Sequence, residues 1–98
     1  MYTAMARVTL RIPASASLKD KRQVVRSVLA KVRNQLEVAA AEVADQDVRN
    51  LAVLGLAYVS SEAGHAAEQL DRAIRYIEQS RPDVEITDVQ QDVTSLGG

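Results

Sequence analysis

Residues 51–59 read LAVLGLAYV, and this short run is the most informative segment for the architecture of the chain. Its side chains are apolar on both faces of a β-pleat, which is typical of a strand inside a sheet that is covered on both sides. Gly55 within the run predicts a bulge or a close contact. The run is far shorter than the roughly 20 apolar residues that a membrane span needs. We therefore expect a soluble domain, with no membrane association, built around this central strand.

Three further segments have the pattern of strands. Residues 2–12 alternate apolar side chains with polar ones, and Pro13 ends the pattern. Residues 36–44 are rich in Ala and Val, and residues 84–93 are more polar, as expected of an edge strand. The alternation in the first strand directs Arg7 and Arg11 to the face opposite its apolar side chains.

Two segments have the spacing of amphipathic helices. The first covers about residues 18–34, with Ser17 as a natural N-cap and apolar residues at helical spacing. The second begins near Ser60 and ends at Arg81-Pro82. Right-handed crossovers place both helices on one face of a four-stranded antiparallel sheet. The order β-α-β-β-α-β predicts an α+β fold, the ferredoxin-like split-βαβ plait, as a single domain over residues 1–98.

This plait leaves the other face of the sheet open. The central strand would present apolar side chains there, and such a face usually packs on a partner. A second copy of the chain is the simplest candidate, so we expect a homo-oligomer, with a dimer favoured.

The chain has no cysteine. Disulfide scaffolds, thiolate metal sites and cysteine nucleophiles are therefore excluded. The N-terminus has no basic segment followed by an unbroken apolar run, so we expect no signal peptide and a cytoplasmic location. No glycine-rich phosphate loop occurs, and no cofactor or small-molecule substrate is indicated.

Charge is distributed unevenly along the chain. Residues 1–36 hold eight Lys/Arg and one acid, a net +7, whereas residues 37–98 hold four Arg and twelve acids, a net −8. The basic residues gather on the first predicted helix, and such a stripe suits contacts with phosphates. Its members are Lys19, Lys21, Arg22, Arg26 and Arg33. Arg7 and Arg11 would contribute if the open face of the sheet is free.

A different interpretation of the stripe remains open. It can be a solvated helix face, or it can pair with acids of another chain such as Asp45 and Asp47. The loop before the first helix could dock an anion on free N–H groups, but simple capping by Ser17 is the favoured interpretation.

Two other candidate sites are weak. Glu42, Asp45 and Asp47 form an acidic cluster, but their spacing matches no calcium loop, so we expect no metal site. His65 falls opposite the apolar stripe of the second helix and should be exposed, with no nucleophile placed beside it. We therefore expect no catalytic residue and no enzymatic activity.

One resemblance is specific. Residues 10–22, LRIPASASLKDKR, with 41–47, AEVADQD, and 52–55, AVLG, resemble the bacterial YlxP-like family, a domain-of-unknown-function group. The resemblance implies a ferredoxin-like fold and, from the gene surroundings of the family, a role in translation or ribosome maturation. It implies no catalytic residue. Our first hypothesis is thus a non-enzymatic accessory protein that associates with RNA or ribosomal particles; the alternative is a homo-oligomeric structural or regulatory interaction module.

Overall fold

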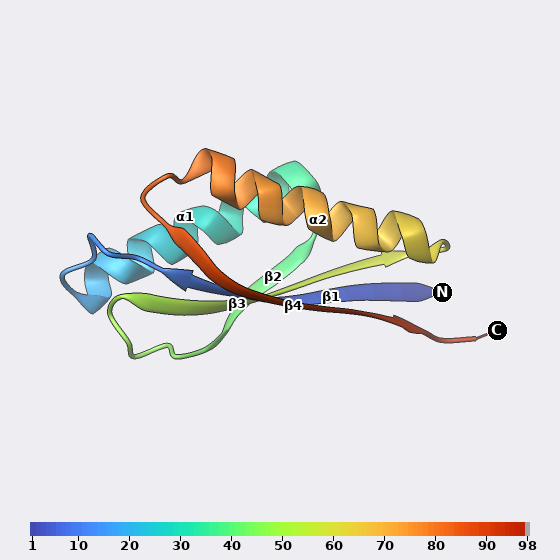
Figure 1. The fold of residues 1–98 in the computed structure, drawn as a ribbon, viewed down its shortest axis with the longest axis horizontal. Coiled ribbons are helices and arrows are strands. Elements are labelled where there is room, and N and C mark those ends of the chain that lie inside the picture. The colour runs from blue at the N-terminus through green and yellow to red at the C-terminus, as the bar shows by residue number, and fades with distance from the viewer. Residues whose placement is uncertain (98) are drawn as a thin grey trace.

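Six elements follow one another along residues 1–97, which are the residues that the computed structural model describes (Figure 1). They are β1 (Tyr2–Arg11), α1 (Leu18–Leu36), β2 (Ala39–Ala44), β3 (Leu51–Ser60), α2 (Ala63–Ser80) and β4 (Glu85–Ser95). Their order confirms the predicted β-α-β-β-α-β plait.

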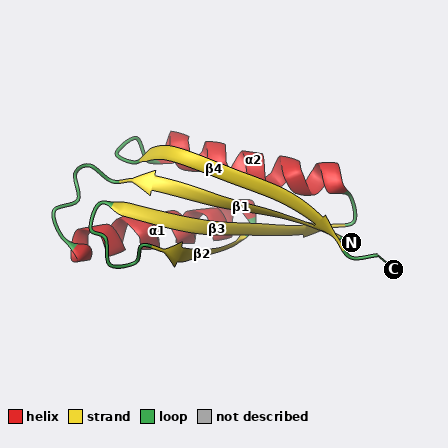
Figure 2. Ribbon diagram, turned by 60° about the horizontal axis from the view of Figure 1, so that its bottom comes forward, coloured by secondary structure: helices red, strands yellow, loops and turns green. Residues whose placement is uncertain are grey.

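The four strands form one antiparallel sheet in the order β2-β3-β1-β4. β3 lies inside it and pairs with β1 over their full length, from Tyr2 opposite Ser60 to Arg11 opposite Leu51. Both helices lie on the same face of the sheet (Figures 1 and 2). The predicted central position of residues 51–59 is thus confirmed, although only one face of this strand is covered by helices.

The end of α1 differs from the prediction. The helix continues through Leu36, which the sequence had placed in the second strand, and Glu37 then ends it in the left-handed conformation (φ 57°). Leu36 follows Val32 by four residues, so it falls on the same buried face and is stabilised there by the core. β2 consequently begins only at Ala39.

The core lies between the helices and the sheet. Val8 and Leu10 of β1 and Leu54 of β3 are completely buried on the helix side. α2 contributes Ala66 and Ala73, whose small side chains let the helix backbone come close to the strands. Full burial of each large aliphatic side chain stabilises the fold by about 2 kcal/mol.

The opposite face of the sheet is uncovered and has two halves. Over β2 and β3 it is apolar, and a shallow hollow of about 310 Å³ lies there against Met5, Ala41, Val43, Gly55 and Ala57, among others. A Cβ on Gly55 would lie 2.9 Å from Val43 Cγ1, so the predicted close contact at this glycine is confirmed and is made by a side chain. Over β1 and β4 the face is charged. Residues that pair across antiparallel strands share a face, so Arg7 and Arg11 of β1 lie on it together with Glu85, Asp88 and Asp92 of β4.

Candidate nucleic-acid interface

The N-terminus of α1 is closed by its own side chains. Ser17 Oγ accepts a hydrogen bond from Asp20 N at 3.1 Å, and Asp20 Oδ2 accepts one from Ala16 N at 3.2 Å. This arrangement resembles a capping box and uses free N–H groups at the helix start. Arg49 also donates to the Ser15 carbonyl at 2.9 Å, which fixes the loop to the β2–β3 connection. The interpretation of Ser17 as an N-cap is confirmed.

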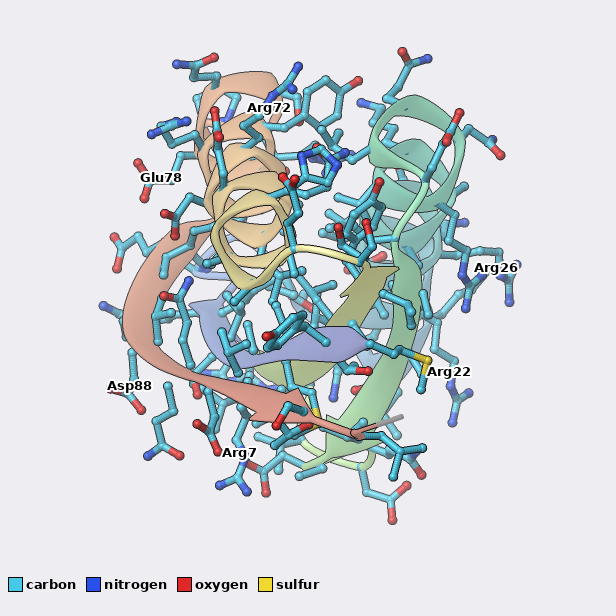
Figure 3. The ribbon with its side chains drawn as sticks, turned by 90° about the vertical axis from the view of Figure 1, so that its right-hand side faces the viewer. Arg7, Arg22, Arg26, Arg72, Glu78 and Asp88 are labelled. Carbon is cyan, nitrogen blue, oxygen red and sulfur yellow. The ribbon has the colours of Figure 1, made fainter. Side chains whose placement is uncertain are left out.

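Three basic residues of α1 form an exposed row one turn apart: Lys19, Arg22 and Arg26. Within residues 1–97 none of them has an acidic partner within 4.0 Å. Arg22 and Arg26 are four residues apart, so two like charges lie next to each other on the helix surface, an arrangement that is mildly destabilising by itself. Both project from the side of the molecule that faces away from α2 (Figure 3).

Arg33 continues this row toward the end of α1, but its guanidinium is engaged. Its Nε donates to the Ala40 carbonyl at 3.1 Å, and a second guanidinium nitrogen donates to the same oxygen. Arg33 therefore fastens the end of α1 to the beginning of β2. It remains exposed, and an arginine has five N–H donors, so some of them are still available.

Lys21 does not belong to the exposed row, and the prediction that it contacts phosphate is wrong. Its side chain is completely buried, with Nζ 2.6 Å from the Asp45 carbonyl and 2.9 Å from Glu42 Oε2. Oε2 accepts no well-aligned hydrogen bond, so its contact with Nζ is an ion pair held mainly by charge. Lys21 precedes Val25 by four residues on the core-facing side of α1, and this spacing was the available signal.

Two of the three residues of the acidic cluster at the hairpin, Glu42 and Asp45, make structural contacts with Lys21. Glu42 pairs with Lys21, and Asp45 adopts the left-handed conformation (φ 55°) that aims its carbonyl at the same ammonium. In the described part of the chain, no group of three His, Asp or Glu residues is arranged to hold a metal ion. The buried charge of Lys21 accounts for Glu42, since a buried cation needs a nearby anion.

Arg7 and Arg11 lie on the open face of the sheet, as predicted, and therefore far from the row on α1. Arg7 extends below the sheet, on the side opposite the helices (Figure 3). Arg11 lies 3.5 Å from Glu85 of β4. The register places Asp88 and Asp92 on the same face. The structure thus divides the predicted basic residues into an exposed row on α1 and a mixed-charge patch on the sheet.

A second feature adjoins the row on α1. Arg22, Val25, Arg26 and Leu29 of the helix, with Glu42 of β2, line a hollow of about 200 Å³, here named the α1–β2 hollow. Sequence reasoning missed it because the contact between α1 and β2 depends on how the helix packs. The helical spacing of Val25 and Leu29, next to Arg22 and Arg26, was the only available signal.

The remaining candidates are unremarkable in chemistry. His65 is exposed, as expected. Its ring packs edge-on against the ring of Tyr58, with 5.6 Å between the ring centroids. Tyr58 packs against the core on the helix side of the sheet. Among the described residues, neither helix is long and apolar enough to cross a bilayer.

Comparison with solved structures supports the fold. A designed protein with a ferredoxin fold superposes with a TM-score of 0.63 at 13% identity, over 100% of this chain and 89% of the designed one. A dimeric ferredoxin-like protein from an uncultured marine organism superposes with a TM-score of 0.55 at 8% identity, over 100% of both chains. At such low identity these similarities establish the fold alone.

Comparison of sequences establishes the family. The family described as "Protein of unknown function (DUF503)" matches residues 3–91. The protein YlxP of Bacillus subtilis, described as uncharacterised, is 34% identical over 73 residues, which cover 74% of this chain and 78% of that protein. The predicted resemblance is confirmed, and the chain belongs to the DUF503 family, the YlxP-like proteins of unknown function.

Proposed function

We propose that this protein is a non-enzymatic RNA-binding accessory protein that contacts the phosphate backbone through Lys19, Arg22 and Arg26. The observation that carries the proposal is the row itself: three exposed cations on one side of α1 with no acidic partner in the described chain. Each such cation displaces a counterion when it meets a phosphate, which favours binding at low salt.

The open face of the sheet is less suited to nucleic acid. Two arginines there face the carboxylates of Glu85, Asp88 and Asp92, which would repel a polyanion. The central strand presents Val53, Gly55, Ala57 and Val59 to that side, so it has no aromatic platform for base stacking. We therefore assign phosphate contacts to α1 and leave Arg7 and Arg11 out of the interface.

Binding of labelled RNA, followed by fluorescence anisotropy over a range of salt concentrations, tests the proposal. We expect the double variant R22E/R26E to lose at least about ten-fold in affinity, with a smaller salt dependence. The control is R72E/R75E, which changes the net charge by the same amount at two exposed positions on α2. Equal binding by the wild type and R22E/R26E would contradict the proposal.

A separate experiment tests whether the RNA that this protein binds belongs to ribosomal particles. In a sucrose gradient of cell lysate, we expect the wild type to migrate with ribosomal particles at low salt and at the top of the gradient at high salt. R22E/R26E should remain at the top in both conditions. A wild type that stays at the top of the gradient at low salt would exclude stable ribosome association. It would not decide RNA binding itself, which the anisotropy measurement tests.

A second candidate function is a homo-oligomeric interaction module, favoured by the uncovered apolar half of the sheet. Met5 and Val43, which are 43% and 53% exposed, line the hollow together with small residues, and Val59, on the same face of β3, is 58% exposed. Four strands about 4.8 Å apart and at most about 30 Å long give the whole open face, with its apolar and charged halves together, roughly 600 Å², which is not far below the about 800 Å² per partner of a standard interface. Its charged half carries both signs, so a second copy would not be repelled as a whole.

Light scattering after size-exclusion chromatography tests this candidate. We expect a dimer that V59K converts to a monomer, while V89K, on the opposite face of β4, leaves it intact. A wild type that is monomeric at every accessible concentration would contradict it.

A further inference from the structure

We propose that the α1–β2 hollow receives one unpaired base of the bound RNA, so that the RNA ligand is single-stranded. This inference rests on the proposed function and adds to it the class of RNA. It begins from the position of the hollow, which lies beside two of the three cations of the row on α1.

The lining of the hollow suits a flat ring next to a phosphate. Val25 and Leu29 provide the apolar part of the lining, and Arg22 and Arg26, which line it as well, carry their guanidinium groups on long, exposed side chains that can reach a base in the hollow. Arginine guanidinium planes stack on unpaired bases and, at the same time, hydrogen-bond to phosphates. Val25 belongs to the core and Leu29 packs against it, so the apolar part of the lining is held in place by the fold itself.

Glu42 supplies an acceptor at the edge of the hollow. Its carboxylate is compensated by Lys21 from inside the protein, so it does not need Arg22 or Arg26 as a counterion. Oε2 is buried, but the side chain as a whole is 18% exposed, and Glu42 is one of the residues that line the hollow. A carboxylate there can accept a hydrogen bond from the exocyclic amine of a base such as cytosine.

A base can enter such a hollow only from a single strand. In an RNA duplex the bases are paired and stacked, and the grooves present mainly sugars and phosphates to a protein. A duplex would therefore meet the three cations but leave the hollow empty. An abasic chain keeps the single-stranded backbone and its phosphates, so the difference in affinity between single-stranded RNA and this chain measures the contribution of the base.

A peptide strand added to the free edge of β2 is another conceivable ligand beside α1, and the hydrogen bonds of this edge argue against it. The carbonyls of Ala40 and Glu42, two residues apart, lie on the same side of the strand. Arg33 donates to the first, and Gln46 Nε2 donates to the second at 3.3 Å. With these acceptors occupied by side chains, the edge is protected against strand addition.

The test compares three fluorescent ligands of equal length: a single-stranded RNA, its duplex, and an abasic ribose–phosphate chain. We expect the wild type to prefer the single strand by about ten-fold over both others, the size of one stacked base. L29S should remove the preference without removing salt-dependent binding. The control is V24S, because Val24 is also a half-buried residue of α1 that packs on the core, and it lies outside the hollow.

Each outcome decides between the two proposals. Equal affinity for the three ligands, or an L29S variant that keeps the preference while its circular dichroism matches the wild type, would overturn the hollow as a base site and leave phosphate binding intact. No salt-sensitive binding of any ligand would overturn the proposed function itself. Preference for the single strand that is lost in L29S and kept in V24S would support the inference.

Discussion

Lys21 of α1 and Glu42 of β2 form a buried ion pair, with Nζ 2.9 Å from Oε2, at the point where the first helix meets the edge of the sheet. The pair joins the helix that carries the proposed RNA contacts to the strand that lines the α1–β2 hollow. A basic residue that looks like a ligand contact in the sequence thus serves as the internal counterion of the site.

Loss of Lys21 should destabilise the protein strongly. K21M leaves the Glu42 carboxylate without its counterion, and we expect the free energy of unfolding to fall by about 3 kcal/mol. The double variant K21M/E42Q removes both charges and should regain much of this loss. Denaturant unfolding of both variants measures the difference, and equal stability of K21M and the wild type would contradict a structural role.

The N-cap of α1 should contribute a smaller amount. S17A removes the acceptor for Asp20 N, and we expect a loss of about 1 kcal/mol in the free energy of unfolding. S17D keeps an acceptor at the same position and should lie close to the wild type. Thermal unfolding followed by circular dichroism compares them; a loss in S17D as large as that in S17A would contradict the cap.

Asp83 should titrate at unusually low pH. The hydrogen bonds from the Arg81 guanidinium, at 2.7 and 2.9 Å, lower the pKa of this carboxyl from its ordinary 3.8. A lowered folded-state pKa stabilises the protein above the unfolded pKa, and this contribution is lost as the pH falls through the folded one. Because the Asp83 side chain is 44% exposed, solvent screens the pair, which contributes at most about 1 kcal/mol. NMR titration of Asp83 should give a higher pKa in R81A, and an unchanged value would contradict the cause.

Arg26 and Arg33 should differ in their effects, although both are exposed cations of α1. R26A should weaken RNA binding and lower the salt slope by about 0.7 to 1, with little change in stability. R33A should lower stability by about 1 kcal/mol, because the Ala40 carbonyl loses its donors, and should change affinity less. Paired anisotropy and unfolding measurements test the contrast; it fails if R33A is the more damaging to binding.

Gly55 should tolerate no large side chain. A Cβ there would lie 2.9 Å from Val43 Cγ1, and the β-branched Val43 has few alternative rotamers. We expect G55V to destabilise the protein by about 2 kcal/mol, and V43A to relieve part of this cost in the double variant. Denaturant midpoints compare the variants, and additive losses would show that the two residues are not in conflict.

Most of the fold could be predicted from local patterns. Alternation identified β1, the run of residues 51–59 identified an internal strand, and Ser17 marked the start of α1. The boundary between α1 and β2 was wrong because Leu36 fits both a helix stripe and an apolar strand. Its burial against the core, which is not a local property, decided the outcome.

The candidate site was predicted only in outline. The basic character of α1 was evident, but the division among Lys21, Arg33 and the exposed row was not. Lys21 and Arg33 both donate to backbone carbonyls on the β2 side, 24 and 7 residues further along the chain, and these carbonyls come within reach only after the chain has turned at the end of α1. The α1–β2 hollow, likewise, exists only because a strand lies beside the helix.

Local sequence was enough to predict the order of the elements, the apolar faces of the helices and the concentration of positive charge on α1, because these follow from the identity and spacing of neighbouring residues. The tertiary structure alone decided which cations face water, which acid compensates Lys21 and which face of the sheet stays open. Burial and pairing depend on distances between segments that are far apart along the chain, and only packing sets those distances.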